Sequence, residues 1–239
     1  MVMELDIKNL LPKKALNPDF WKGKDNLLDE EIKKQLVKMV MFFKEQLSLE
    51  LDDIDDIIIT GSIANYNWSK FSDVDLHVLV DFDKINIDRD LLEDYFNSKK
   101  NLWNNLHDIK THGHDVEIYV QDSKEPHHAT GLYSLVQDKW LAVPTPEFKD
   151  FNKTLVKEKT KNYMKLIDFI EEKLEEDPLQ AMKMSDKLQD KLKTMRSAGL
   201  ERDGEFSHEN LTYKLLRRQK YLEKLYNIEN EAFDKLMTI

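Results

Sequence analysis

The sequence predicts an α/β (α+β) fold in which a small mixed β-sheet is flanked by helices and followed by a C-terminal helical domain. Three observations carry this prediction. Apolar residues recur at steps of three and four over 28–47, which is typical of an amphipathic helix. Short β-branched or alternating runs at 57–60, 74–80 and 116–120 are typical of strands. From about Phe148 onward the apolar spacing is helical.

The composition excludes several classes of protein. The chain has 239 residues and no cysteine, which excludes a disulfide framework, a cysteine-based zinc site and a thiol nucleophile. No apolar run approaches the roughly 20 residues that span a bilayer, and residues 1–6 lack the features of a signal peptide. We therefore expect a soluble cytoplasmic protein with no membrane partner. The net charge of −10 disfavours binding to extended duplex DNA.

The first half of the chain alternates between helical and strand patterns. The helix over 28–47 is followed by the buried strand 57–60, which ends at Gly61. A helix over 88–107 and a third strand over 116–120 come next, and 133–143 adds a hairpin or edge strand. The strand 74–80 alternates, so its residues divide between the two faces of the sheet. One face receives Val74, Leu76, Val78 and Val80, and the other receives Asp73, Asp75, His77 and Leu79.

The second half is predicted to hold three helices. The first carries an apolar stripe from Tyr163 to Leu174. The second begins at Asp177-Pro178, since Asp is a good N-cap and Pro is favoured at the first helical position. We expect it to end at Gly199, as a glycine beyond the last helical residue. Ser207 then caps one last long helix that continues through Leu225.

These patterns predict three parts of the chain. Residues 1–27 form an N-terminal extension, residues 28–146 the sheet-containing domain and residues 147–239 the helical domain. Pro144 and Pro146 mark the boundary between the two domains, because proline interrupts regular structure.

Positive charge is concentrated late in the acidic chain. Residues 1–180 hold 24 Lys+Arg and 36 Asp+Glu, whereas residues 181–226 hold 11 Lys+Arg and 7 Asp+Glu. One reading is a set of solvated lysines on helix surfaces. The other is a basic wall that faces an acidic site and completes it for an anionic ligand. The candidates for contact with a triphosphate or an acceptor are Arg196, Lys214, Arg217 and Arg218.

The most informative motif joins a strand-end glycine to a pair of carboxylates. Gly61 permits a tight turn and the close approach of a bulky anion, and Ser62 adds a hydroxyl. Asp73 and Asp75 flank one apolar residue, so both carboxylates lie on the same face. Glu117 stands alone between apolar residues at the centre of the third strand, where a buried unpaired acid is costly. Three such carboxylates suit two Mg²⁺ or Mn²⁺ ions that also contact substrate phosphates.

At these residues the sequence resembles the DNA polymerase β-like nucleotidyltransferase superfamily. The matching pattern is the strand with Gly61-Ser62, ten residues, Asp73-Val74-Asp75-Leu76, and the later Val116-Glu117-Ile118. The resemblance implies a palm domain over 28–146 in which Asp73 and Asp75 bind both metals. Glu117 would bind the catalytic metal and help to deprotonate the acceptor hydroxyl. Gly61 and Ser62 would hold the phosphates of a nucleoside triphosphate such as ATP.

The runs 115–122 and 195–200 are similar to small predicted nucleotidyltransferases of tailed bacteriophages. That narrower resemblance implies the cytoplasm of an infected bacterium. The acceptor is not implied and is an RNA or tRNA end, a protein or a small molecule. The third acid is Glu where the superfamily commonly has Asp. The alternative is an inactive member that acts as a binding or regulatory module, like an antitoxin.

Several other residues admit two readings. His77 shares the face of Asp75 and is either a substrate contact or a structural histidine. Asp115 is a rival third ligand. The aromatic residues Tyr66, Trp68 and Phe71 either pack a short helix onto the sheet or stack on a base. The spacing of four further histidines matches no closed zinc module, so a loop cluster without metal is expected for His112, His114, His127 and His128.

Overall fold

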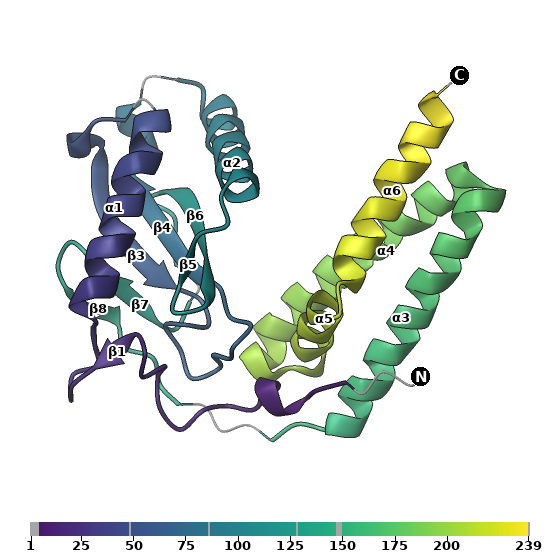
Figure 1. Ribbon diagram of the computed structural model, residues 1–239, viewed down its shortest axis with the longest axis horizontal. Helices are drawn as coiled ribbons and strands as arrows, with labels where there is room; N and C mark the ends of the chain where they lie inside the picture. The colour runs from purple at the N-terminus through teal and green to yellow at the C-terminus, as the bar shows by residue number, and fades with distance from the viewer. Residues whose placement is uncertain (1–4, 48, 86, 128, 147–149, 239) are drawn as a thin grey trace. The chain divides into compact units, whose positions relative to one another are not determined.

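A computed structural model describes residues 5–47, 49–85, 87–127, 129–146 and 150–238. The chain divides into two compact units (Figure 1). One is the sheet unit, residues 11–148, and the other is the helical unit, residues 149–239 together with residues 1–10. The predicted extension 1–27 is therefore shared between the units. The predicted domain boundaries remain predictions, because a compact unit is not by itself an independently folding domain.

The sheet unit contains a six-stranded mixed sheet, as the sequence predicts. Its strand order is β5-β6-β4-β3-β7-β8, with β4 and β6 parallel and every other neighbouring pair antiparallel. The strands are β3 (Ile54–Thr60), β4 (Val74–Val80), β5 (Lys110–Thr111), β6 (His114–Asp122), β7 (Leu132–Ser134) and β8 (Lys139–Ala142). A separate ribbon joins β1 (Trp21–Lys22) to β2 (Leu27–Leu28).

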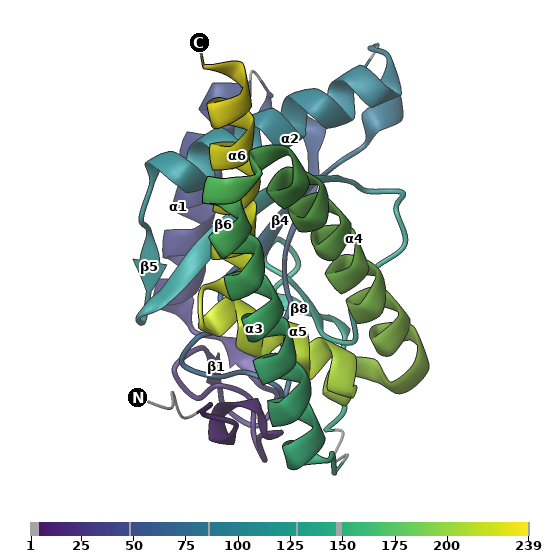
Figure 2. The ribbon, with the colours of Figure 1, turned by 90° about the vertical axis from the view of Figure 1, so that its right-hand side faces the viewer.

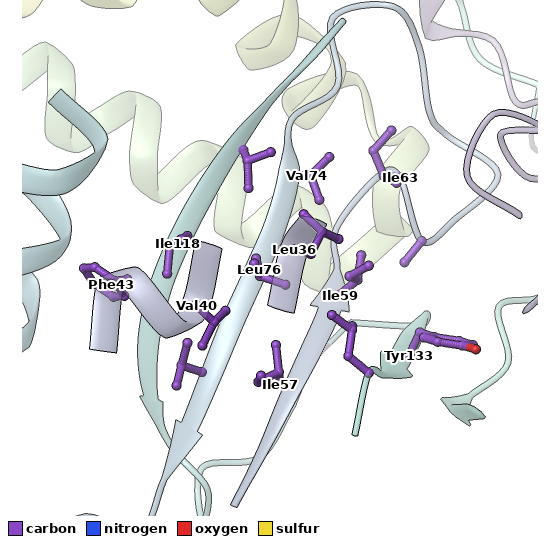
Figure 3. Packing of buried hydrophobic residues seen from close by; sticks show 14 of the residues in the cluster. Leu36, Val40, Phe43, Ile57, Ile59, Ile63, Val74, Leu76, Ile118 and Tyr133 are labelled. Atoms are coloured by element: carbon purple, nitrogen blue, oxygen red, sulfur yellow. The ribbon is translucent and has the colours of Figure 1, made fainter. Parts of the chain in front are cut away.

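Helices α1 (Glu30–Leu47) and α2 (Arg89–Leu106) cover one face of the sheet. The parallel pairing of β4 and β6 requires a crossover, which α2 provides. Figure 3 shows the apolar side chains of α1 lying over those of the central strands. The predicted period of the first helix is confirmed, since its buried residues are Ile32, Leu36, Val40, Phe43 and Leu47.

The opposite face of the sheet is more polar. A small apolar cluster of Ile58, Leu79 and Leu132 occupies part of it. The half-buried side chains of Asp75, His77, Glu117 and Tyr119 alternate with the buried apolar residues of β4 and β6. This alternation places the predicted carboxylates on the face that α1 and α2 do not cover.

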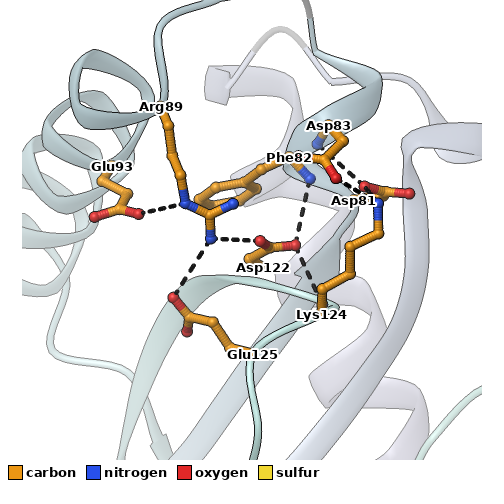
Figure 4. A network of polar contacts seen from close by, with 8 residues as sticks. All are labelled: Asp81, Phe82, Asp83, Arg89, Glu93, Asp122, Lys124 and Glu125. Carbon is orange, nitrogen blue, oxygen red and sulfur yellow. Dashed lines mark hydrogen bonds and ion pairs between the residues drawn. The ribbon is translucent and has the colours of Figure 1, made fainter.

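A network of charges closes the far end of β4 and β6 (Figure 4). The buried carboxylate of Asp122 accepts hydrogen bonds from Arg89 Nη2 at 2.5 Å and from the N–H of Lys124 at 3.2 Å. Burial favours the protonated acid, but these hydrogen bonds prevail and hold the pKa of Asp122 below its usual range. Because Arg89 begins α2, the network fixes the start of that helix to the end of β6.

The helical unit consists of four α-helices in the described part of the chain. Asp177 caps the second of them by accepting a hydrogen bond from the N–H of Gln180 at 3.0 Å, as predicted. Ser207 likewise caps the third through the N–H of Asn210. The helices are α3 (Lys153–Glu176), α4 (Pro178–Asp203), α5 (His208–Arg218) and α6 (Tyr221–Met237).

Two predicted helix ends are wrong. Helix α4 continues past Gly199 to Asp203, and Gly204, with φ +75°, follows its end. Gly199 is buried inside the helix because the turn at Ser207 and Glu209 approaches it closely. The predicted last long helix is broken into α5 and α6, since Lys220 adopts a left-handed backbone conformation with φ +60°. No described helix has the length and apolar character that crossing a membrane requires.

We expect Gly199→Ala to destabilise the protein. At an open helix position this change stabilises by about 1 kcal/mol. Here the new Cβ would lie 2.6 Å from Glu209 Cβ and 2.9 Å from Ser207 Oγ. Overpacking of this kind costs about 1–3 kcal/mol and reverses the sign. Urea unfolding followed by circular dichroism at 222 nm measures the change.

Ser197→Ala, at an exposed position of the same helix, is the matched control. It should stay within about 0.5 kcal/mol of the parent chain. A Gly199→Ala chain more stable than the parent would contradict the close contact.

Candidate functional site

The turn after β3 brings a glycine against a carboxylate. Gly61 has φ +71°, a left-handed conformation that glycine adopts without strain. Thr60 is the antiparallel register partner of Asp75, so the turn begins directly beside that acid. A Cβ at position 61 would lie 1.7 Å from Asp75 Oδ2. The missing side chain of Gly61 therefore provides the space in which the Asp75 carboxylate lies.

The register of β4 and β6 places a second acid beside Asp75. Asp75 and Glu117 are register partners on neighbouring parallel strands, and such strands lie roughly 4.8 Å apart. Both side chains are half-buried. Asp73 lies immediately before β4 and is also half-buried. All three predicted carboxylates thus belong to one small region of the sheet.

Tyr119 contacts this region from β6. Its hydroxyl donates a hydrogen bond to Glu117 Oε2. Its ring stacks on His77 with the ring centroids 4.9 Å apart, and Lys100 Nζ lies 4.6 Å from the ring centroid. Burial is the largest cause that raises the pKa of Tyr119, followed by the hydrogen bond to Glu117 and the charges of Glu117, Asp75 and Asp73. The charges of all three acids therefore reach one phenol.

Carboxylate oxygens are the donors that Mg²⁺ and Mn²⁺ prefer, so the residues present fit such ions chemically. The space that Gly61 leaves for the Asp75 carboxylate supports the same fit. Within the described residues, however, no three His, Cys, Asp or Glu side chains surround a point at which a metal ion could lie. Glu117 directs one oxygen to Tyr119 instead.

Residues 62–73 form turns, so the short helix considered there is not formed. Ser62 Oγ donates a hydrogen bond to Ser72 Oγ at 2.7 Å, and the N–H of Ser69 donates to the same Ser72 oxygen at 2.9 Å. The hydroxyl hydrogen of Ser62 is thereby used within the loop. From the sequence, the hydroxyl of Ser62 as well as its backbone was a candidate for phosphate binding, and that hydroxyl has a partner within the loop.

Two of the three loop aromatic residues pack onto the core. Tyr66 and Trp68 lie against the core that α1 and α2 form with the sheet, and Trp68 Nε1 donates to the carbonyl of Ala15 at 2.8 Å. Phe71 is 45% exposed. The packing interpretation thus holds for Tyr66 and Trp68.

The described histidines take part in no group of three or more side chains that could hold a metal ion. His77 is hydrogen-bonded through Nδ1 to Gln121 at 2.7 Å, and burial lowers its pKa. His114 is buried, with Nδ1 bonded to the carbonyl of Ser72 at 2.6 Å. His112 lies beside Phe20 before β6 begins, whereas His127 follows the end of that strand. His128 lies outside the described residues.

Asp115, the rival third ligand, is exposed and forms an ion pair with Lys110. Its side chain therefore has a partner outside the Asp75–Glu117 region. The sequence offered no direct sign of that pairing, since Lys110 belongs to the preceding short strand β5.

The basic candidates belong to the helical unit. Lys214 lies on α5 with its side chain only 17% exposed, and its Nζ forms an ion pair with Glu205 at 2.8 Å. Arg196 Nε donates to Asn210 Oδ1 at 3.2 Å. Arg217 is exposed at the end of α5, and Arg218 Nη2 donates to the carbonyl of Asn9 at 3.4 Å. Lys214 and Arg196 thus have structural partners in their own unit.

Sequence reasoning missed Tyr119 and Lys100. Tyr119 stands two residues after Glu117 on the same strand face, and that spacing could have indicated the contact. Lys100 comes from α2, and no local pattern places it over Tyr119.

No family model matches the chain, and no curated protein matches it. Among solved structures, one described as a STING-associated CdnE c-di-GMP synthase from Capnocytophaga granulosa is 15% identical. The match covers 88% of this chain and 84% of that one, with a TM-score of 0.21.

We expect Gly61→Ala to cost more stability than Gly113→Ala. Both glycines have positive φ, +71° and +80°, so both changes impose backbone strain of about 1 kcal/mol. A Cβ at 113 meets nothing within 4 Å, whereas a Cβ at 61 collides with the Asp75 carboxylate. The collision should add about 1–3 kcal/mol in denaturant unfolding. Equal losses in the two variants would show that Asp75 does not fill the space beside Gly61.

Proposed function

We propose that the protein is a metal-dependent nucleotidyltransferase. It transfers a nucleoside monophosphate from a nucleoside triphosphate to an acceptor hydroxyl and releases pyrophosphate. The observation that carries this proposal is the placement of Asp75 and Glu117 as register partners, with Asp75 against the Gly61 turn and Asp73 two residues away.

Each residue has a definite part in the proposed reaction. Asp73, Asp75 and Glu117 would hold Mg²⁺ or Mn²⁺, which lowers the pKa of the acceptor hydroxyl and offsets charge on the triphosphate. Glu117 would also accept the proton of that hydroxyl. The acceptor oxygen then forms a bond to the α-phosphorus as the bond from that phosphorus to the bridging oxygen breaks, and pyrophosphate takes the electron pair.

The turn at Gly61 and Ser62 would bind the outer phosphates of the nucleotide through its backbone N–H groups. Lys214 and Arg217 are proposed as further nucleotide contacts, although Lys214 already has Glu205 as a partner. The acceptor is an RNA or tRNA end, a protein or a small molecule. We place the reaction in the cytoplasm, which for a phage-encoded chain is that of the bacterial host.

The proposal is tested by product analysis. The chain is incubated with each α-labelled nucleoside triphosphate, Mg²⁺ or Mn²⁺, and separate pools of RNA, protein and small molecules. Label should enter one pool. Asp75→Asn and Glu117→Gln, which keep the side-chain shape, should each lower the rate by about 100-fold or more. Asp115→Asn is the matched control, because Asp115 lies on the same strand and pairs with Lys110.

Calorimetric titration with Mn²⁺ and nucleotide separates the two functional hypotheses. Nucleotide binding without transfer to any pool would favour the inactive binding module. Absence of both binding and transfer would refute the nucleotide site. Equal rates in Asp75→Asn and Asp115→Asn would refute the assignment of the carboxylates.

Removing the Tyr119 hydroxyl should lower the metal affinity and the transfer rate without abolishing either. Tyr119→Phe keeps the ring on His77 but loses the hydrogen bond that directs Glu117. Loss of a group that orients a metal ligand costs about 10- to 100-fold in metal affinity or rate. Mn²⁺ affinity and transfer rate should both fall within that range. Tyr95→Phe, whose hydroxyl donates to the carbonyl of Leu47 at 3.3 Å, should change neither.

A further inference from the structure

Charge is segregated along helix α3. Its first half, residues 153–165, holds five lysines and one acid. The following residues 166–177 hold six acids and one lysine. Along one helix the charge therefore changes sign near its midpoint, which a helix with uniformly mixed solvated charges would not show.

The same division extends over the neighbouring helices. Helices α3 and α4 run antiparallel from their joint at Asp177 and diverge, with α5 between their far ends (Figure 2), so the middle of α4 lies beside the first half of α3. The ring of Tyr163 confirms this pairing, because Lys191 Nζ lies 5.9 Å from its centroid. Residues 187–196 of α4 hold four basic residues and one acid. Basic residues of the first half of α3 and the middle of α4 thus lie close together and are here called the basic end, although the last turn of α4 adds Glu201 and Asp203 beside Arg202.

The lysines of α3 are available at the surface. Lys153, Lys161 and Lys165 are exposed and Lys157 is half-buried. Each is four residues from the next, so neighbours in the row share a helix face and follow one another along it. Among the described residues none of these four lysines forms an ion pair, whereas Lys159 beside them is paired with Glu209 at 2.7 Å.

Two aromatic rings accompany the positive charge. Tyr163 lies under Lys191, and Tyr213 lies under Arg196, whose guanidinium carbon is 4.9 Å from its ring centroid. Both rings are half-buried. Both rings also pack against the buried core of the helical unit, so the cations above them are the groups that the phosphates of a nucleic-acid strand could contact.

The distribution of apolar side chains argues against a membrane surface as the partner. Binding to anionic lipid combines lysines with apolar side chains that enter the bilayer. In the helical unit the large exposed apolar side chains lie beyond the lysine row, on the later part of α3, the start of α4 and α6: Leu166, Phe169, Leu179, Tyr226, Phe233, Leu236 and Met237.

We propose that the basic end binds the sugar–phosphate backbone of a single nucleic-acid strand, with the lysine row of α3, Lys153, Lys157, Lys161 and Lys165, as its main contact. The net charge of −10 opposes the binding of an extended duplex, which needs many phosphate contacts. This binding is independent of the proposed transfer reaction, because it needs neither nucleotide nor metal.

Fluorescence anisotropy of the full chain with a labelled 20-mer of uridine RNA tests the binding, without nucleotide or metal. Equivalent DNA and an RNA duplex are the other arms. The triple variant Lys157→Glu, Lys161→Glu and Lys165→Glu should lower RNA affinity by about 100-fold at 0.1 M salt. The slope of log affinity against log salt should become shallower by about two, since each phosphate contact contributes roughly 0.7.

The matched control is Lys24→Glu, Lys34→Glu and Lys38→Glu, which changes the net charge equally at exposed lysines of the sheet unit. It should lower affinity no more than about threefold. If circular dichroism shows that the triple Glu variant of α3 does not fold, the same three lysines are changed to Gln instead. The three control lysines are then changed to Gln as well. The Gln variant should then lose about tenfold relative to its control.

Three outcomes would overturn the proposal: no RNA or DNA binding at 0.1 M salt, equal losses in the α3 variant and its control, or tighter binding to the duplex than to the strand. Binding to phosphatidylserine vesicles without RNA binding would replace the nucleic acid by a lipid surface. A strand that binds and depends on α3 supports the proposal even where the transfer reaction is absent.

Discussion

The parallel pairing of β4 and β6 is the constraint on which the rest of the sheet unit depends. Because side chains alternate along each strand, a slip of one residue would move Glu117 to the face covered by α1 and α2 and would expose Val116 or Ile118. The register is fixed from outside the pair. Asn104 of α2 accepts from the N–H of Ile118 at 3.2 Å and donates to its carbonyl at 3.3 Å. The helix that makes the crossover thus also occupies the open edge of β6.

Two different devices position the acids within that register. Asp75 lies where a missing side chain at Gly61 leaves space, so its place is defined by shape. Glu117 is held by the hydroxyl of Tyr119, so its place is defined by a directional bond. A carboxylate can exchange one hydrogen-bond partner for another more readily than the backbone around it can change shape. Glu117 is therefore the acid better able to change its partner when a ligand arrives.

Much of this could be predicted from the sequence, because each element carries its own period. The alternation of β4 assigned Asp75 and Leu76 to opposite faces correctly. The predicted end of α4 at Gly199 was wrong because a glycine that ends a helix and a glycine that allows close packing have the same local sequence pattern. Only the contact of Gly199 with Glu209 distinguishes the two roles. Lys220 gave no sign of its left-handed backbone, which separates α5 from α6. The lysine row of α3 was concealed because the acids in the second half of the helix cancel its charge when α3 is counted as a whole.

The contact between Gly61 and Asp75 also limits how this sequence can change. A side chain at position 61 becomes acceptable in space only after the carboxylate at position 75 has been shortened or lost. A chain that keeps the carboxylate at position 75 must keep the glycine at position 61. In a chain that has lost the carboxylate, the steric reason for a glycine at position 61 is gone. The two positions are therefore epistatic. Once the carboxylate is lost, position 61 can accept other residues, and restoring the acid would then require the glycine to be restored as well.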